Sequence, residues 1–178
     1  VQALWDQAYT IENYRVTGYR VPMGIPVSSW RSVGASQNGF FNESMIDELA
    51  IEASADPIEM RLGLITHQPT RNVLEAVANM ANWGRDVAEI KILNVYVAAD
   101  LGIAIDSRNI DAQLISAVNF GLAGAMMGEI TLLDGKVQQT NFHNYDAIRM
   151  HQAPVIHTKI LENGERIRGI GEPGTPTA

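Results

Sequence analysis

The C-terminal stretch Arg168-Gly169-Ile170-Gly171-Glu172-Pro173-Gly174-Thr175-Pro176-Thr177 places one carboxylate among glycines and prolines. Because glycine has no Cβ, such a backbone can approach a ligand closely, and a carboxylate fixed there can serve as a general base. A glutamate in a Gly/Pro turn is more commonly a solvated turn residue. Glu172 is therefore a candidate base whose assignment depends on the rest of the chain.

The same stretch matches the dinucleotide-binding fingerprint, Gly-x-Gly-x-x-Gly, at positions 169 to 174. That fingerprint needs a strand before it and a helix after it. Here Pro173 and Pro176 interrupt the would-be helix. A dinucleotide site of this type is excluded at the tail.

Composition narrows the class of protein. The chain has 178 residues, of which 46% are apolar and 19% charged, as in globular proteins. A formal net charge of -7 disfavours nucleic acid as a main partner, because phosphate binding needs a basic surface. No apolar run approaches the roughly 20 residues of a membrane helix. We expect the chain to be part of something larger, because Val1 is not a start methionine and no helix or strand closes the C-terminus.

Metal-site and redox motifs are sparse. Without cysteine, the chain itself cannot supply a disulfide, a zinc thiolate site or cysteine ligands for an iron–sulfur cluster, although this does not fix its compartment. The four histidines show no ligand spacing on a shared helix face. We therefore assign no side chain as a metal ligand.

The N-terminal third combines a loop with three predicted helices. A strand is possible over residues 12–21, and Trp30 to Gln37 then leads into a helix over residues 38–54. Such a loop either binds an anion at the helix N-terminus or packs its tryptophan on the core. Further helices are predicted from Asp56-Pro57, where Asp56 suits the N-cap, and over residues 70–82. The acidic face of the first helix is most simply a solvated face.

The second half predicts strands around one apolar helix. A long strand is expected over residues 86–99, and a helix begins at residue 109 or 110 and runs to about 127. This helix lacks charge from Ala112 to Gly128, so we expect it to be buried. Gln113, in its expected first turn, then needs a partner for its amide, either a ligand or a neighbouring loop.

A hairpin is predicted around Asp134-Gly135, and a last strand over residues 155–161. The order of elements indicates an α+β fold of antiparallel strands packed by several helices. We expect residues 1–178 to form the C-terminal portion of a domain. Two sub-lobes are possible: residues 1–84, mainly helical, and residues 85–178, with the strands, the apolar helix and the hairpin.

Four segments together resemble a known family. They are Trp30 to Gln37 (Trp-Arg-Ser-Val-Gly-Ala-Ser-Gln), residues 42–50, residues 100–128 and the Gly-Glu-Pro-Gly-Thr tail. In this order they resemble the molybdopterin-binding large subunit of the xanthine dehydrogenase and aldehyde oxidase family, closest to isoquinoline 1-oxidoreductase beta subunits and related bacterial aldehyde dehydrogenases. The resemblance covers nearly the whole chain, but only the C-terminal portion of such a subunit.

The resemblance implies a chemistry and a set of residues. The family's base falls on Glu172, which would take the proton from a hydroxyl ligand of molybdenum while an aldehyde or N-heteroaromatic carbon is oxidised with water-derived oxygen. The family's loop arginine falls on Arg31, and its cofactor-contacting glutamine on Gln113. Cofactor contacts would also come from backbone groups of Ser32, Val33 and Gly34, and from Gly171. In this family no side chain binds the metal.

The resemblance also implies partners. The cofactor would be molybdopterin, in the cytosine dinucleotide form, with molybdenum, and electrons would leave through iron–sulfur clusters on a small partner subunit. The remainder of the large subunit, or other chains of the complex, would complete the site. The family's Gly-rich segment between residues 84 and 85 is absent here. The alternative is a non-catalytic chain that serves assembly of such a complex.

Overall fold

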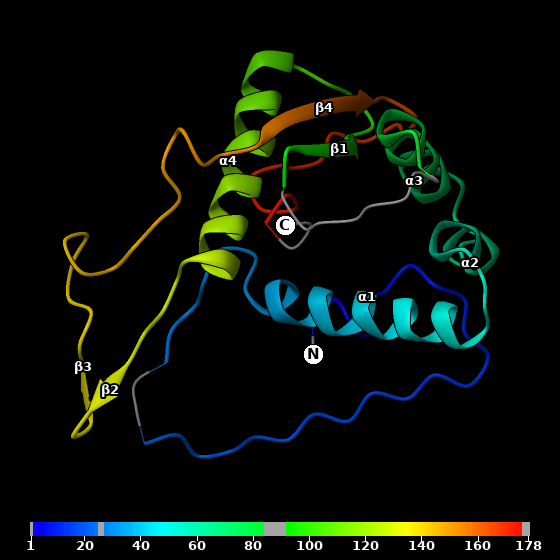
Figure 1. Ribbon diagram of the computed structural model, residues 1–178. Helices are drawn as coiled ribbons and strands as arrows, with labels where there is room; N and C mark the ends of the chain where they lie inside the picture. Colours follow the sequence, from blue (N-terminus) through cyan, green and yellow to red (C-terminus); the bar gives the residue numbers. More distant parts are fainter. Residues whose placement is uncertain (1, 25–26, 84–91, 176–178) are drawn as a thin grey trace.

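The computed structural model describes residues 2–24, 27–83 and 92–175 (Figure 1). Four helices and four strands are present in this part of the chain. The helices are α1 (Gly34–Glu52), α2 (Pro57–Leu64), α3 (Gln68–Ala81) and α4 (Ser107–Met126). The strands are β1 (Asn94–Asp100), β2 (Leu132–Leu133), β3 (Lys136–Val137) and β4 (Val155–Leu161). The mixed α+β class expected from the sequence is confirmed.

The three N-terminal helices lie close to their expected positions. Helix α1 begins four residues earlier than predicted, at Gly34, so the loop before it is shorter. Helix α2 begins as its cap predicts, because the Asp56 side chain accepts hydrogen bonds from the backbone N–H groups of Ile58 and Glu59 at 2.8 and 3.0 Å. The strand predicted over residues 12–21 is wrong. That segment has no strand pairing and runs alongside α1 (Figure 1).

The acidic face of α1 is not simply solvated. The guanidinium of Arg61 in α2 bonds Glu43 at 2.9 Å and Asp47 at 2.7 Å, and it also donates to the carbonyl of Pro57. Glu43 accepts a further hydrogen bond from the hydroxyl of Tyr9 at 2.6 Å. Burial, followed by this contact with Glu43, raises the pKa of Tyr9 well above its ordinary value. These charges join α1, α2 and the N-terminal segment.

The two long strands pair in parallel, which corrects the antiparallel prediction. Asn94 lies opposite Val155 and Asp100 opposite Leu161. Parallel neighbours need a long crossover connection, and α4 lies within the connection between these two strands. The start of the strand predicted from residue 86 lies outside the described residues. Among the strands of the described residues, antiparallel pairing is limited to β2 with β3.

Helix α4 buries one face and exposes the other. Its buried residues pack with β1 in one core cluster, formed by Val97, Leu101, Ile110, Leu114, Val118 and Leu122. Ile115 and Phe120 on the remaining surface are exposed. The burial expected of this helix is therefore found on one face only, because the apolar surface of α4 is wider than the part that the described residues cover. No helix in the described residues is long and apolar enough to cross a membrane.

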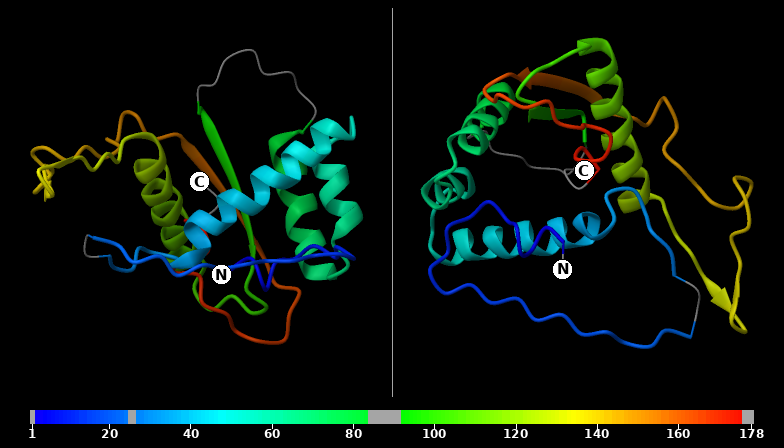
Figure 2. Two further views of the ribbon diagram at one scale, coloured as in Figure 1. Left: turned by 90° about the horizontal axis from the view of Figure 1, so that it is seen from below. Right: turned by 180° about the vertical axis from the view of Figure 1, so that it is seen from behind.

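The hairpin around Asp134-Gly135 forms as predicted, with shorter strands. Both turn residues have positive φ, 49° and 74°, as a tight two-residue hairpin turn requires. The hairpin projects away from the helices and the sheet in the views of Figures 1 and 2. Its four strand residues, Leu132, Leu133, Lys136 and Val137, are all exposed.

A second core cluster, separate from that of α4, contains Tyr9, Ile46 and Ile65. It binds α1 and α2 to the N-terminal segment, while α3 packs against β1. The division into sub-lobes at residue 84 remains a prediction. The loop before α1 and the C-terminal tail meet α4 between the two clusters, and this junction contains most of the predicted site residues.

Candidate functional site

The loop before α1 has an unusual backbone. Ser32 and Val33 adopt positive φ values of 69° and 47°, a region that non-glycine residues seldom enter. The Ser36 hydroxyl donates to the Arg31 carbonyl at 2.6 Å, and the Val33 N–H donates to the Trp30 carbonyl at 2.8 Å. These two bonds fold the loop back on the start of α1. They present the side chains of Arg31 and Ser32 to the tail.

Arg31 binds the tail and α4 at the same time. Its Nε donates to the Gly171 carbonyl at 2.8 Å, and Nη2 donates to the same oxygen. Nη1 reaches the Ser116 hydroxyl at 3.2 Å and Nη2 the Gln113 side-chain oxygen at 3.3 Å. Every one of these acceptors is neutral, and no carboxylate pairs with Arg31 in the described part of the chain. The guanidinium charge is fixed in place without being neutralised.

Ser32 contacts the residue that carries the candidate base. Its side chain is buried, with 3% of the residue exposed, and its hydroxyl donates to the Glu172 carbonyl at 2.6 Å. The Thr175 N–H donates to the same carbonyl at 3.0 Å, closing a β-turn with Pro173 in its second position. Two consecutive loop residues therefore hold two consecutive carbonyls of the tail, those of Gly171 and Glu172.

The tail packs closely on α4. A Cβ added at Gly174 would lie 2.9 Å from the Ala117 Cβ, so only glycine fits without a shift. The Thr175 hydroxyl is buried there without a described hydrogen-bond partner. Glu172 itself is exposed, and its carboxylate has no partner within the described residues. The main chain of Glu172 is thus held in place, while its carboxylate makes no contact that would prevent it from meeting a bound molecule.

Gln113 differs from its prediction in two ways. It is exposed rather than buried, and it lies in the second turn of α4, because the helix begins at Ser107. The Asp106 side chain accepts hydrogen bonds from backbone N–H groups of the first turn, those of Arg108 and Asn109. Gln113 therefore meets a neighbouring loop through Arg31, and its amide N–H groups remain available to a ligand.

An aromatic contact between Trp30 and Phe120 packs the loop against α4. Trp30 packs against Phe120 of α4, with ring centroids 4.8 Å apart, and the Arg31 guanidinium lies 5.8 Å from the Phe120 ring centroid. A Cβ at Gly124 would approach the Trp30 ring to 2.9 Å. The packing of Trp30, which is 45% exposed, is therefore on an exposed part of α4 and not on the core as one interpretation of the loop expected. It does not compete with ligand binding, because Arg31 faces the tail.

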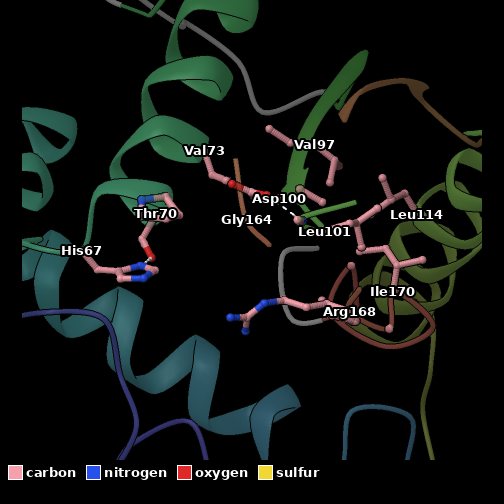
Figure 3. Close-up of a pocket in the computed structure, with 17 residues that line it drawn as sticks. His67, Thr70, Val73, Val97, Asp100, Leu101, Leu114, Gly164, Arg168 and Ile170 are labelled. Carbon is pink, nitrogen blue, oxygen red and sulfur yellow. Dashed lines mark hydrogen bonds between the residues drawn. The ribbon is translucent and has the colours of Figure 1, made fainter. Parts of the chain in front are cut away.

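Two pockets adjoin the tail. One, of about 670 Å³, lies between β1, the start of α3 and tail residues on both sides of Glu172 (Figure 3). The Arg168 side chain extends across it toward the start of α3 (Figure 3). The other, of about 980 Å³, lies between α1 and α4 and is lined by Trp30, Gly124 and Thr175 among others. Residues of the tail thus line both pockets.

Asp100 lies at the first pocket. Burial by itself raises the pKa of this carboxyl, but hydrogen bonds from the Gly102 and Asn163 backbone and the charge of Arg168 hold the pKa below its ordinary value. Gly102 has a φ of 73°, and a Cβ there would lie 2.1 Å from the Arg166 carbonyl oxygen. The strand end and the returning tail are therefore fixed against each other.

Five of the predicted site residues lie together in the structure: Arg31, Ser32, Gln113, Gly171 and Glu172. No described hydrogen bond joins Val33 or Gly34 to this group. The Val33 side chain is exposed, and the Gly34 N–H bonds the Gln2 side chain at 3.3 Å. Pro176 and Thr177 of the tail, and the junction at 84/85, lie outside the described residues. Within those described, no group of three His, Asp or Glu side chains could hold a metal ion.

Sequence reasoning missed two contributions. Ser116 is not among the predicted site residues, although its position three residues after Gln113 places both on one face of the helix. The Ser32 side chain was also missed, because the prediction considered only the backbone there. No sequence signal shows that a loop hydroxyl contacts a carbonyl 140 residues away.

Comparisons with known proteins show which proteins this chain is similar to. Residues 1–63, which include the Arg31 loop, match the molybdopterin cofactor-binding domain. The chain is 25% identical to the beta chain of isoquinoline 1-oxidoreductase from Brevundimonas diminuta, over 94% of this chain and 26% of that protein. It is 37% identical over 75 residues to one of the subunits of nicotinate dehydrogenase from Pseudomonas putida, which is 42% of this chain and 6% of that protein.

A third relative is the membrane-bound aldehyde dehydrogenase of Gluconacetobacter polyoxogenes, whose name assigns it pyrroloquinoline quinone. It is 22% identical over 96% of this chain and 29% of that protein. The chain thus spans little more than a quarter of the first two relatives it matches along its whole length. The matched domain and these relatives support a place for this chain among molybdopterin-binding proteins of the xanthine oxidase family.

Proposed function

We propose that this chain forms part of a molybdenum hydroxylase that oxidises an aldehyde or an N-heteroaromatic carbon with oxygen derived from water. The relatives are named for isoquinoline, nicotinate and aldehyde oxidation, which supports these two substrate classes. The observation that carries the proposal is the junction at which Arg31 holds the Gly171 carbonyl and Ser32 holds the Glu172 carbonyl, on either side of the Glu172 Cα. Among the described residues, the Glu172 carboxylate has no hydrogen-bond or ion-pair partner, and no carboxylate pairs with Arg31.

The residues at the junction fit an anionic, hydrogen-bonding cofactor. Arg31 offers a charge that no described carboxylate neutralises, Gln113 offers amide N–H groups, and Thr175 offers a buried hydroxyl without a described partner. A molybdopterin carries phosphate and pterin acceptors, and such donors suit both. We assign contacts with it to Arg31, Ser32, Val33, Gly34, Gln113 and Gly171. The cytosine dinucleotide form is the form we propose.

Glu172 is the proposed general base. The bound cofactor would supply the two-electron oxidation, and Glu172 would accept a proton at a carboxylate oxygen as the substrate carbon is attacked. The β-turn from Glu172 to Thr175 and the loop contacts hold the main chain, so the base needs little reorganisation before it acts. Its exposure in this chain leaves room for cofactor and substrate on the same side.

Partner chains follow from the same proposal. Without cysteine the chain cannot ligate an iron–sulfur cluster, so we place the clusters that accept the electrons on a small partner subunit. The remainder of the large subunit would cover the exposed apolar surface of α1 and α4, which includes Phe40, Met45 and Ile115. The same exposed surface also favours the alternative, a chain that serves only assembly.

Replacement of Glu172 by glutamine distinguishes a catalytic chain from a chain that serves only assembly. In the complete complex, Glu172→Gln should lower turnover by roughly 10²- to 10⁴-fold, the range for loss of a general base, while assembly and molybdenum content stay normal. Glu165→Gln is the matched control, because Glu165 is an exposed glutamate seven residues earlier in the tail. Normal turnover of Glu172→Gln, or a complex without molybdenum after cofactor-replete expression, would contradict the proposal.

A further inference from the structure

The hydroxyl of Ser32 is placed in a way that the proposed contacts of the loop do not require. Its oxygen lies 2.6 Å from the carbonyl oxygen of Glu172, the residue whose carboxylate is the proposed base. The two residues are 140 positions apart, and Ser32 is only 3% exposed. The buried side chain of Ser32 thus contacts the main chain of Glu172, the first residue of the β-turn from Glu172 to Thr175.

The backbone of Ser32 adopts an uncommon conformation to make this contact. Its φ of 69° lies in the left-handed region, which is unfavourable for a non-glycine residue. Glycine would relieve that cost but would remove the hydroxyl. What distinguishes Ser32 from Ser54, another serine with positive φ, is the buried hydroxyl and its bond to the Glu172 carbonyl.

The bond between Ser32 and Glu172 restricts the directions in which the Glu172 carboxylate can point. The Glu172 carbonyl also accepts the Thr175 N–H, and Arg31 binds the preceding carbonyl of Gly171. With the peptide planes on either side of its Cα held, Glu172 keeps freedom only in its side-chain torsions. Arg31 has further acceptors on α4, whereas the hydroxyl of Ser32 has this single described bond.

We propose that Ser32 is a positioning residue for Glu172, whose buried hydroxyl sets the main chain from which the carboxylate projects. The inference rests on the proposed function, because it assumes that Glu172 is the base. Misplacement of a catalytic group by about 1 Å can cost up to roughly a hundredfold in rate. Loss of the hydroxyl should therefore reduce kcat while substrate binding, and hence KM, is little changed.

The test compares two substitutions at two serines in the complete, molybdenum-loaded complex. Ser32→Ala removes the hydroxyl and keeps the backbone cost, and Ser32→Gly removes both. Ser54 is the matched control, because it also has a positive φ, 52°, yet is exposed and makes no described side-chain hydrogen bond. We expect both Ser32 variants to lower kcat about tenfold or more, and both Ser54 variants to keep wild-type kcat.

Three further measurements separate positioning from loss of structure. The acid limb of the pH profile of kcat/KM should move in the Ser32 variants, since the base is then held differently. Trypsin should cleave after Arg166 or Arg168 faster in the Ser32 variants than in the Ser54 variants, because the tail is released. Molybdenum content should stay at the wild-type level.

The outcomes are distinct. If Glu172→Gln is inactive but both Ser32 variants match wild type in kcat, pH profile and cleavage rate, the positioning role is overturned. The same holds if their lower kcat merely follows a loss of molybdenum. If Ser32→Gly has wild-type kcat while Ser32→Ala is impaired, the turn keeps its position without the hydroxyl, which also overturns the positioning role. An active Glu172→Gln variant would remove the proposed function and this inference together.

Discussion

Arg31 and Arg61 both tie distant segments together, but they differ in what surrounds their charge. Arg61 is bonded to two carboxylates, Glu43 and Asp47, and its side chain is 10% exposed. Arg31 donates only to neutral acceptors on the tail and on α4, within the described residues. An arginine paired with acids has its charge neutralised within the fold, whereas one held by neutral groups keeps it for a ligand. The first is a structural contact and the second is part of a candidate site.

The largest effect on stability is expected at Arg61. Arg61→Met should lower the free energy of unfolding by about 2–4 kcal/mol, because it leaves two carboxylates facing each other and removes the hydrogen bonds between α1 and α2. Denaturant unfolding measures this. The contrast is Arg149→Ala, which breaks the exposed pair with Asp146 and should cost less than about 1 kcal/mol. Equal losses in the two variants would contradict the structural role of the Arg61 cluster.

Arg31 should show the opposite pattern. Arg31→Met leaves neutral groups that water can reach, so we expect a stability loss of only about 1 kcal/mol. Turnover of the complex should fall by at least about tenfold, since the free charge and the grip on Gly171 are both lost, and roughly tenfold corresponds to 1.4 kcal/mol. Steady-state kinetics and metal analysis measure this.

The variant Arg31→Lys separates the effect of the positive charge from the effect of the guanidinium's hydrogen bonds. It keeps the charge but loses the planar fork that reaches Gly171 and Gln113 together. We expect molybdenum content to be retained more fully than in Arg31→Met, with turnover still reduced. If Arg31→Met were as unstable as Arg61→Met and had normal turnover once folded, the distinction between the two arginines would be lost.

The smallest effect concerns Asp100, a carboxylate held mainly by backbone N–H groups. Because its pKa is lowered in the folded chain, the unfolded state binds the proton first as pH falls. Its contribution to stability is present above the ordinary carboxyl pKa of about 4 and is lost as the pH falls through the lower, folded value. The stability difference between wild type and Asp100→Asn should therefore shrink in acid. A difference that is constant from pH 7 to pH 3 would contradict this assignment.

Several elements could be predicted from the sequence because their signals are local. The cap at Asp56, the turn at Asp134-Gly135 and the strand from Val155 to Leu161 each depend on neighbours a few residues away. The parallel pairing of β1 with β4 could not, because residue alternation does not report which distant strand lies alongside. The strand predicted over residues 12–21 failed for a related reason, since no partner strand lies beside it in the described part of the chain.

The sequence by itself determined which residues could form the site: a carboxylate in a glycine-rich turn, an arginine in a loop before a helix and a glutamine on an apolar helix. Only the tertiary structure decided how they are joined. Arg31 and Ser32 meet Gly171 and Glu172 across 140 positions, and Gln113 turned out to be exposed instead of buried. The physical reason is that hydrogen-bond donors and acceptors select partners by position in space, which chain order does not specify.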